Sequence, residues 1–209
     1  MITNFFDPNL LSGKTVVITG AGRGIGLEVA NLMVECGAKI IAHSGRIGTS
    51  KDLSGISSSV FEADFSDPNS VKQFIDFVQA ETSVIDVLIN NAGTMLGRFL
   101  ADELTSDQYQ QLVSLNQTSV VQITSALIPW LRKSQNASII NTVSISATTG
   151  GSPGSSIYSA TKAFVSTYTK ALARELAPDN IRANAVSPGT IATDFHKRYS
   201  SEEKLESTR

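Results

Sequence analysis

Tyr158 and Lys162 stand four residues apart in the segment YSATK. Within a helix, positions i and i+4 lie on one face, one turn apart, so both side chains are predicted to point the same way. A free tyrosine has a pKa of about 10, and a neighbouring ammonium lowers that pKa by favouring the phenolate. Such a pair could act as a general acid–base catalyst near neutral pH. The same spacing arises by chance in amphipathic helices that carry a solvated lysine, so other motifs must decide.

The segment TGAGRGIG, residues 19–26, follows an apolar β-branched run. Glycines let a backbone turn tightly and approach a pyrophosphate, and the N-terminus of the next helix offers free N–H groups to the anion. The glycines fall at Gly20, Gly24 and Gly26, a spacing that differs from G-x-G-x-x-G. The segment SGKT is not a triphosphate loop, because Pro8 stands where that loop needs its first glycine and the lysine precedes the strand.

The end of the second apolar run, AHSGR, bears on the choice of dinucleotide. NAD sites usually place a carboxylate there for the ribose 2′-hydroxyl. Ser44 and Arg46 stand there instead, and Arg23 in the glycine turn adds positive charge that suits a 2′-phosphate. We therefore expect NADP(H) to be preferred, with NAD(H) possible. The alternative is that both arginines are solvated loop residues.

Short β-branched runs alternate with longer helical patterns along the chain. This alternation predicts an α/β fold, a doubly wound parallel sheet of six strands with helices on both faces. In such sheets, ligands bind at the carboxyl ends of the strands. Strands are expected at 14–19, 38–43, 59–63, 86–90, 138–144 and 181–188, helices at 24–37, 67–82, 105–134 and 155–178, and a loop at 44–59.

The composition is that of an ordinary globular chain, with 209 residues, 41% hydrophobic and 17% charged, and it predicts one domain over 1–209. A net charge of −2 argues against nucleic-acid and anionic-membrane partners. The start lacks a secretory signal, no apolar run is long enough to span a membrane, and Cys36 has no second cysteine to pair with, so a cytoplasmic setting is expected. His43 and His196 are too isolated to predict a metal site.

Four motifs, TGAGRGIG, NNAG, YSATK and NAVSPG, occur in this order and together resemble the short-chain dehydrogenase/reductase family from about Gly13 to Asp194. The resemblance implies a Rossmann-like fold and an NAD(P)-dependent oxidoreductase. It implies catalytic roles for Tyr158, Lys162 and Asn116, the last as the anchor of a proton-relay water. The cofactor contacts that the glycine turn and the resemblance together indicate are Gly20, Arg23, Gly24, Ile25, Gly26, Asp64, Asn91, Ala92, Gly93, Tyr158, Lys162, Pro188, Gly189 and Thr193.

The catalytic serine of the family usually lies thirteen residues before the tyrosine, a position held here by Ile145. Ser144 fits if the following loop carries one extra residue, and Ser146 fits if it carries one fewer. Ser144 is preferred, because loops absorb insertions more readily than buried strands do.

The resemblance implies that the chain reduces a small carbonyl compound, a ketone or 3-oxoacyl type, with NADPH, and oxidises the alcohol in reverse. The alternatives are a non-catalytic relative that binds a dinucleotide as a sensor or scaffold, and a truncated, inactive fragment. The family normally continues with a longer substrate lid and a seventh strand, whereas only sixteen mostly polar residues follow Thr193. We therefore expect an exposed sixth strand, a short lid, and a homo-oligomer if a full-length form exists.

Overall fold

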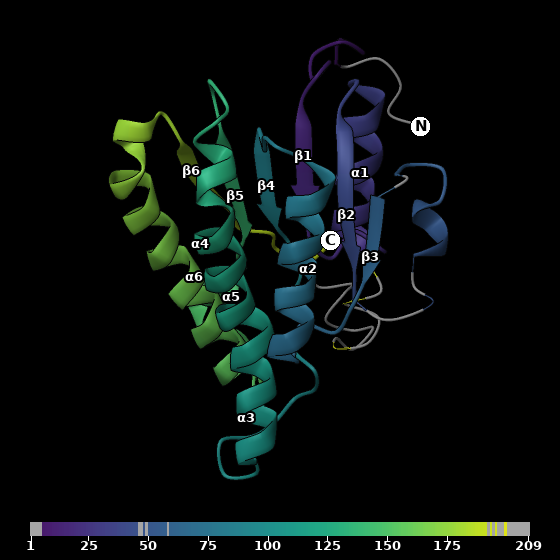
Figure 1. Ribbon diagram of the computed structural model, residues 1–209. Coiled ribbons are helices and arrows are strands. Elements are labelled where there is room, and N and C mark those ends of the chain that lie inside the picture. Colours follow the sequence, from purple (N-terminus) through teal and green to yellow (C-terminus); the bar gives the residue numbers. More distant parts are fainter. Residues whose placement is uncertain are drawn as a thin grey trace.

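A six-stranded parallel sheet lies at the centre of the protein (Figure 1). The computed structural model describes residues 6–45, 48, 50–57, 59–191, 193, 195 and 199. The strand order is β3-β2-β1-β4-β5-β6, every neighbouring pair is parallel, and β6 lies at one edge of the sheet formed by the described residues. The predicted fold class is confirmed. The strands are β1 (Thr15–Ile18), β2 (Lys39–Ser44), β3 (Ser59–Glu62), β4 (Val87–Asn90), β5 (Ser138–Thr142) and β6 (Arg182–Val186).

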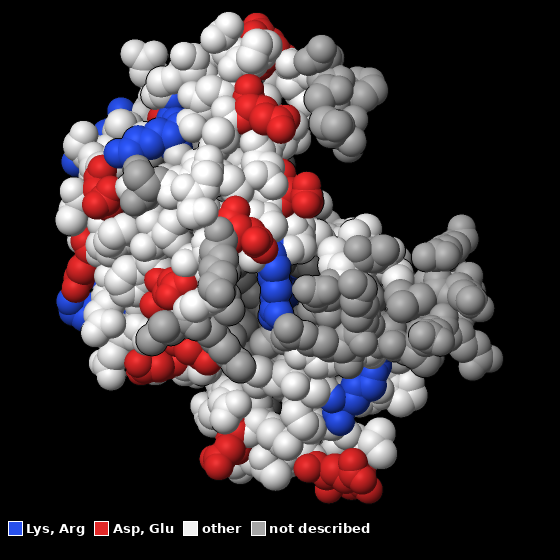
Figure 2. Space-filling model, turned by 90° about the vertical axis from the view of Figure 1, so that its right-hand side faces the viewer, with Lys and Arg blue, Asp and Glu red and all other residues white. Residues whose placement is uncertain are grey.

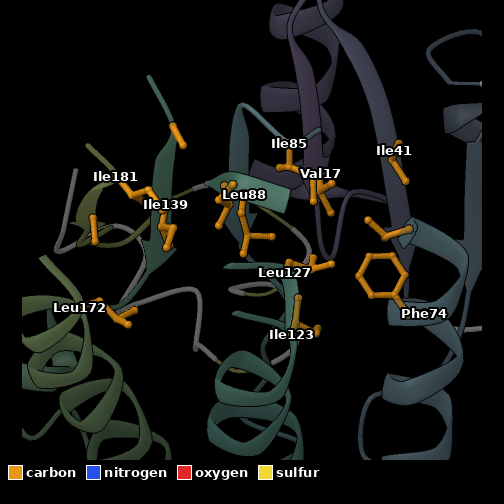
Figure 3. Packing of buried hydrophobic residues seen from close by; sticks show 14 of the residues in the cluster. Val17, Ile41, Phe74, Ile85, Leu88, Ile123, Leu127, Ile139, Leu172 and Ile181 are labelled. Atoms are coloured by element: carbon orange, nitrogen blue, oxygen red, sulfur yellow. The ribbon is translucent and has the colours of Figure 1, made fainter. Parts of the chain in front are cut away.

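Helices cover both faces of the sheet (Figure 1). Alternate residues of β1 point to opposite faces, as the two-residue period of a strand requires. The longer helices are α1 (Gly24–Glu35), α2 (Pro68–Glu81), α3 (Ser106–Val113), α4 (Ser119–Leu131) and α6 (Ser156–Glu175). Val17 joins a buried cluster with residues of α2, α4 and α6, among them Phe74 and Leu127 (Figure 3). Val16 packs on the other face, in a cluster that includes Ala30 of α1.

Local sequence fixes where these helices begin. The Asp67 carboxylate accepts a hydrogen bond from the Asn69 N–H, and Pro68 occupies the first turn of α2. At α3, Thr105 and Gln108 form a reciprocal capping box. Each cap satisfies N–H groups that have no partner inside the helix.

The helix predicted over 105–134 is not one continuous α-helix. A π-helical turn, η2 (Ser114–Thr118), separates α3 from α4. Such a turn inserts one extra residue into a helix and often marks a functional position. The apolar spacing continues on both sides of the turn, so the sequence pattern conceals it.

Two connections differ from the expected elements in smaller ways. The strand predicted over 138–144 ends at Thr142, and a four-residue helix, α5 (Ser146–Thr149), follows it. The predicted loop at 44–59 contains one short 3₁₀ turn, η1 (Lys51–Leu53), and a second such turn, η3 (Ala177–Asp179), follows α6.

Acidic and basic side chains lie interspersed on the face shown in Figure 2. No helix among the described residues is long and apolar enough to cross a bilayer.

Candidate functional site

A cavity of about 690 Å³ opens at the carboxyl ends of the strands. The first part of its lining comes from the glycine turn and the ends of β2 and β3. The second comes from the segments after β4, β5 and β6 and from the start of α6. Predicted site residues that line it are Gly20, Arg23, Gly24, Ile25, Ser44, Asp64, Asn91, Ala92, Gly93, Ser144, Tyr158, Lys162, Pro188, Gly189 and Thr193.

The turn between β1 and α1 needs its glycines for two reasons. Gly20 and Gly24 have φ values of +67° and +55°, a region that L side chains rarely adopt. A Cβ on Gly26 would collide with the carbonyl oxygen of Gly20. Gly26 does not line the cavity, so its role here is to let α1 approach the turn closely.

His43 supports this turn, a role that the sequence did not reveal. The Gly20 N–H donates to His43 Nδ1 at 3.1 Å, and Nε2 lies 2.9 Å from the carbonyl oxygen of Ala63. The ring is buried and stacks on Phe65 with centroids 3.6 Å apart. Burial lowers the pKa of His43 to about 4, so the ring is neutral near neutral pH and Nδ1 remains free to accept.

Asn91 also braces the glycine turn. Its side-chain amide donates to the carbonyl oxygens of Thr19 and Gly20 at 3.2 and 3.0 Å. The Thr142 hydroxyl donates to Asn91 Oδ1 at 3.3 Å. The polar groups of this side chain therefore tie the end of β4 to the turns beside it.

Asn116 lies in the π-helical turn and is completely buried, outside the cavity lining. Its Nδ2 donates to the Thr94 carbonyl oxygen at 2.9 Å, and the Thr94 N–H donates to its Oδ1 at 3.0 Å. A Cβ on Gly93 would lie 3.1 Å from Asn116 Oδ1 and 2.9 Å from Lys162 Nζ. Only glycine therefore leaves room for these two side chains to meet the backbone after β4.

Lys162 is a buried cation at the carboxyl end of β5. Its Nζ donates to the Thr142 carbonyl oxygen at 2.8 Å. Burial lowers the pKa of Lys162 to about 8, because the charged form loses its hydration. The Lys162 side chain is therefore mostly protonated at neutral pH, although a single backbone carbonyl oxygen is the acceptor of its charged group.

Tyr158 lies one helical turn before Lys162 and forms a hydrogen bond with Ser144. Burial raises the pKa of Tyr158, and the bond from Ser144 offsets only part of that rise. The expectation of a pKa below the ordinary tyrosine value is therefore wrong for the described structure. The physical reason is that desolvation outweighs the groups that favour the phenolate.

Of the two candidate serines, Ser144 is the one that meets Tyr158. Ser146 begins α5 and turns its hydroxyl toward Ser144, with the two Oγ atoms 2.9 Å apart. Both residues line the cavity, and Ser144 is the hydrogen-bond partner of the phenol.

Two aromatic residues near the end of the described chain, Phe195 and Tyr199, pack beside Tyr158. The Phe195 ring centroid is 5.8 Å from that of Tyr158, and Tyr199 packs against Phe195 at 5.0 Å. The Tyr199 hydroxyl is 3.0 Å from Thr94 Oγ1, and the Arg98 guanidinium donates to the Tyr199 carbonyl oxygen. The positions of Phe195 and Tyr199 could not be predicted from the sequence, because isolated aromatics in a polar stretch form no periodic pattern.

The remaining predicted contacts differ in how far the structure describes them. Asp64 lines the cavity, and its Oδ1 accepts from the N–H and hydroxyl of Ser66 at 3.0 and 2.8 Å, as a turn-capping residue does. Ser44 is buried at the end of β2. Arg46 and His196 lie outside the described residues. Within the described part of the chain, no group of three or more His, Cys, Asp or Glu side chains could hold a metal ion.

Residues 14–204 match the family described as short chain dehydrogenase. The chain belongs to this family. It is 32% identical over 197 residues to the 3-oxoacyl-[acyl-carrier-protein] reductase FabG of Vibrio cholerae, covering 93% of this chain and 80% of that protein. It is 36% identical over 191 residues to FabG of Chlamydia pneumoniae, covering 88% and 76%. The chain is therefore an NAD(P)-dependent short-chain dehydrogenase similar to these reductases.

Solved structures of family members agree with this assignment. The 3-ketoacyl-(acyl-carrier-protein) reductase of Brucella melitensis complexed with NADH superposes with a TM-score of 0.85 at 30% identity, covering 94% of this chain and 83% of that one. A short chain dehydrogenase of Burkholderia cenocepacia in complex with NADP gives 0.83 at 31% identity, covering 90% and 78%. The cavity and the glycine turn of this short-chain dehydrogenase fit a dinucleotide, since Gly20 and Gly24 leave the turn free of Cβ atoms at positive φ.

Proposed function

We propose that this chain reduces a carbonyl compound to an alcohol with NADPH, and that Tyr158 is the proton donor. The observation that carries the proposal is the hydrogen bond between Ser144 and Tyr158 inside the cavity, one helical turn from the buried ammonium of Lys162. A phenol, a hydroxyl and an ammonium at one cavity wall are the groups that a carbonyl reduction needs. The short-chain dehydrogenase family supports the same reaction class.

Each group has a role that its environment supports. When bound, the nicotinamide supplies the hydride for the carbonyl carbon. Ser144 donates a hydrogen bond to the carbonyl oxygen, and Tyr158 transfers its proton to that oxygen as negative charge develops there. Because burial raises the pKa of Tyr158, the phenol is protonated near neutral pH and ready to donate. The Lys162 ammonium stabilises the phenolate that remains. The Asn116 side-chain amide holds the Thr94 backbone in place through two hydrogen bonds.

The residues proposed to hold the cofactor follow the cavity from one end to the other. The glycine turn would receive the pyrophosphate, and Ser44, Arg46 and Arg23 would receive the 2′-phosphate. Asp64 would face the adenine, Asn91 to Gly93 the middle of the dinucleotide, and Pro188, Gly189 and Thr193 the nicotinamide. The relatives' structures carry NADP in one case and NADH in another, so the NADPH preference rests on the residues of this chain.

A ketone or a 3-oxoacyl thioester is the proposed substrate class. The named relatives are 3-oxoacyl-[acyl-carrier-protein] reductases. The cavity lining includes the apolar side chains of Met95, Leu96 and Ile145, and Ile145 is 55% exposed. These side chains offer apolar surface to the carbon chain of such a substrate.

The test is direct. Purified protein is mixed with NADPH or NADH and a panel of ketones and 3-oxoacyl thioesters, and cofactor absorbance is followed. We expect turnover with at least one carbonyl, and no turnover with Tyr158→Phe, which still binds NADPH by fluorescence titration. Binding of NADPH without turnover of any carbonyl would overturn the proposal and favour a dinucleotide sensor or scaffold.

A further inference from the structure

Ser146 holds both acceptor positions of the Ser144 hydroxyl. The Ser146 N–H donates to Ser144 Oγ at 3.2 Å, and the Ser146 hydroxyl donates to the same atom at 2.9 Å. A serine hydroxyl has two acceptor lone pairs and one proton to donate. With both lone pairs occupied, Ser144 can act only as a donor.

The count leaves the Ser144 proton for the neighbouring phenol. The Ser144 side chain lowers the pKa of Tyr158 against the opposing effect of burial. The three hydroxyls therefore form one chain in which Ser146 donates to Ser144 and Ser144 donates to the phenol oxygen.

The fold keeps Ser146 in place. Its side chain is buried, and its carbonyl oxygen accepts from the Gly150 N–H at 2.9 Å. Gly151, at φ +74°, brings the following loop so near that a Cβ there would lie 3.2 Å from Ser146 Cβ. Ser146 makes its hydrogen bonds to Ser144 from this tightly packed turn. The Ser144 hydroxyl is therefore already ordered before substrate binds.

We propose that Ser146 is a positioning residue that fixes the Ser144 hydroxyl as a donor, to the phenol oxygen in the resting site and to the substrate carbonyl oxygen once substrate is bound. This inference rests on the proposed function, in which Ser144 donates to the substrate carbonyl. Without the Ser146 hydroxyl, Ser144 regains a free lone pair and can accept the proton of Tyr158 as a hydrogen bond. The phenol proton would then be held by Ser144 in the resting site instead of being presented to substrate.

The experiment compares Ser146→Ala with Ser146→Thr, which keeps the hydroxyl, and with Ser159→Ala. Ser159 is a matched control, because it is a buried serine in the same region whose hydroxyl donates to the Gly150 carbonyl oxygen and does not touch Ser144. We expect kcat of Ser146→Ala to fall about tenfold, the effect of losing one hydrogen bond, with KM within about twofold. Ser146→Thr should recover most of kcat, and Ser159→Ala should resemble the parent.

A second measurement does not depend on turnover. The protein is labelled with 3-fluorotyrosine, the Tyr158 resonance is assigned by its loss in Tyr158→Phe, and its titration is followed by fluorine NMR. Ser146→Ala should raise the pKa of this phenol, and Ser159→Ala should leave it unchanged. If the parent turns over no carbonyl, the proposed function fails while this titration still decides the role of Ser146. An unchanged phenol pKa in Ser146→Ala, or a Ser146→Thr variant as slow as Ser146→Ala, would overturn the positioning role.

Discussion

The two ends of the sheet treat buried charge in opposite ways. At the amino end, the Asp86 carboxylate accepts from the Thr15 N–H at 2.9 Å, the Ser134 hydroxyl at 2.7 Å and Lys14 Nζ at 3.1 Å. Burial alone would raise the pKa of Asp86, but these donors outweigh it and the pKa lies below its ordinary value. The carboxylate is therefore held in its charged form.

The carboxyl end holds its buried cation with less compensation. Lys162 donates to a single backbone oxygen, and no carboxylate in the described part of the chain forms an ion pair with it. Burial lowers the pKa of Lys162 to about 8 and that of His43 to about 4. The charge of Asp86 is fully hydrogen-bonded and stabilises the strands, whereas the charge of Lys162 has one partner and remains available to a ligand. This difference distinguishes the structural cluster around Asp86 from the functional cluster around Lys162.

Removing the lysine at the functional end should have the largest effect. Lys162→Met is expected to lower kcat/KM for carbonyl reduction by about 10³-fold, since the phenolate loses its cation. Its thermal midpoint should stay the same or rise, because an under-compensated buried charge is removed. Steady-state kinetics and thermal melting measure both.

Lys14→Met is the matched control at the opposite end. It should lower the free energy of unfolding by about 1 kcal/mol and leave kcat/KM within about twofold. A Lys162→Met enzyme with near-parental turnover would remove the proposed distinction between the two lysines.

The second prediction concerns His43 and pH. The folded pKa of about 4 lies below the ordinary value of 6.5, so the unfolded chain binds more protons between these values. Stability from this group is complete above pH 6.5 and falls as pH drops toward about 4, with a total of about 3 kcal/mol. In the parent, this group should make the free energy of unfolding about 2 kcal/mol lower at about pH 5 than near neutral pH. His43→Phe should lack this difference, as measured by denaturant unfolding at the two pH values.

His43→Phe should also be less stable than the parent at neutral pH, because the Gly20 N–H loses its acceptor. Identical pH slopes for the parent and this variant would show that His43 is not the buried neutral group described here.

The third prediction tests the structural end. Asp86→Asn should lower the free energy of unfolding by about 2 kcal/mol, since charge-assisted hydrogen bonds from three groups are weakened. The dissociation constant for NADPH and the value of kcat should stay close to those of the parent. Denaturant melts and fluorescence titration separate the two effects, and a large loss of kcat in a folded variant would contradict a purely structural role.

Much of the architecture could be predicted from sequence because its signals are local. Strands β1, β2, β4 and β5 contain short apolar runs rich in β-branched residues, and Gly20, Gly24 and Gly26 mark the first turn. The order of most elements and the placement of the glycine turn therefore follow from neighbouring residues. Tyr158 and Lys162 share a helical face by spacing alone.

What the sequence did not predict depends on distant contacts. The role of His43 arises because Phe65 and Gly20, far away in the chain, close around its ring. The direction of the Tyr158 pKa shift is a matter of desolvation, which exists only in the folded site. The π-helical turn around Asn116 was hidden because the apolar pattern continues across it.

The smallest expected effect concerns the choice between NADPH and NADH, and it is tested by comparing a substitution at Arg23 with one at Lys14. Arg23 precedes α1 and lines the cavity, whereas Lys14 lies at the far end of β1 in an ion pair with Asp86. If Arg23 receives the 2′-phosphate, Arg23→Ala should reduce the ratio of kcat/KM for NADPH over NADH about tenfold, equivalent to about 1.4 kcal/mol. Arg46→Ala should act in the same direction.

Lys14→Ala changes the net charge by the same amount as Arg23→Ala, so it controls for a general electrostatic effect, and it should leave the ratio unchanged. The ratio is measured by steady-state kinetics at two salt concentrations, because a nonspecific charge effect is screened while a direct guanidinium–phosphate contact is screened less. If the parent uses NADPH and NADH equally well, the carboxyl end of β2 does not select the phosphate. The positive charge of Arg23 would then serve only the pyrophosphate that both cofactors share.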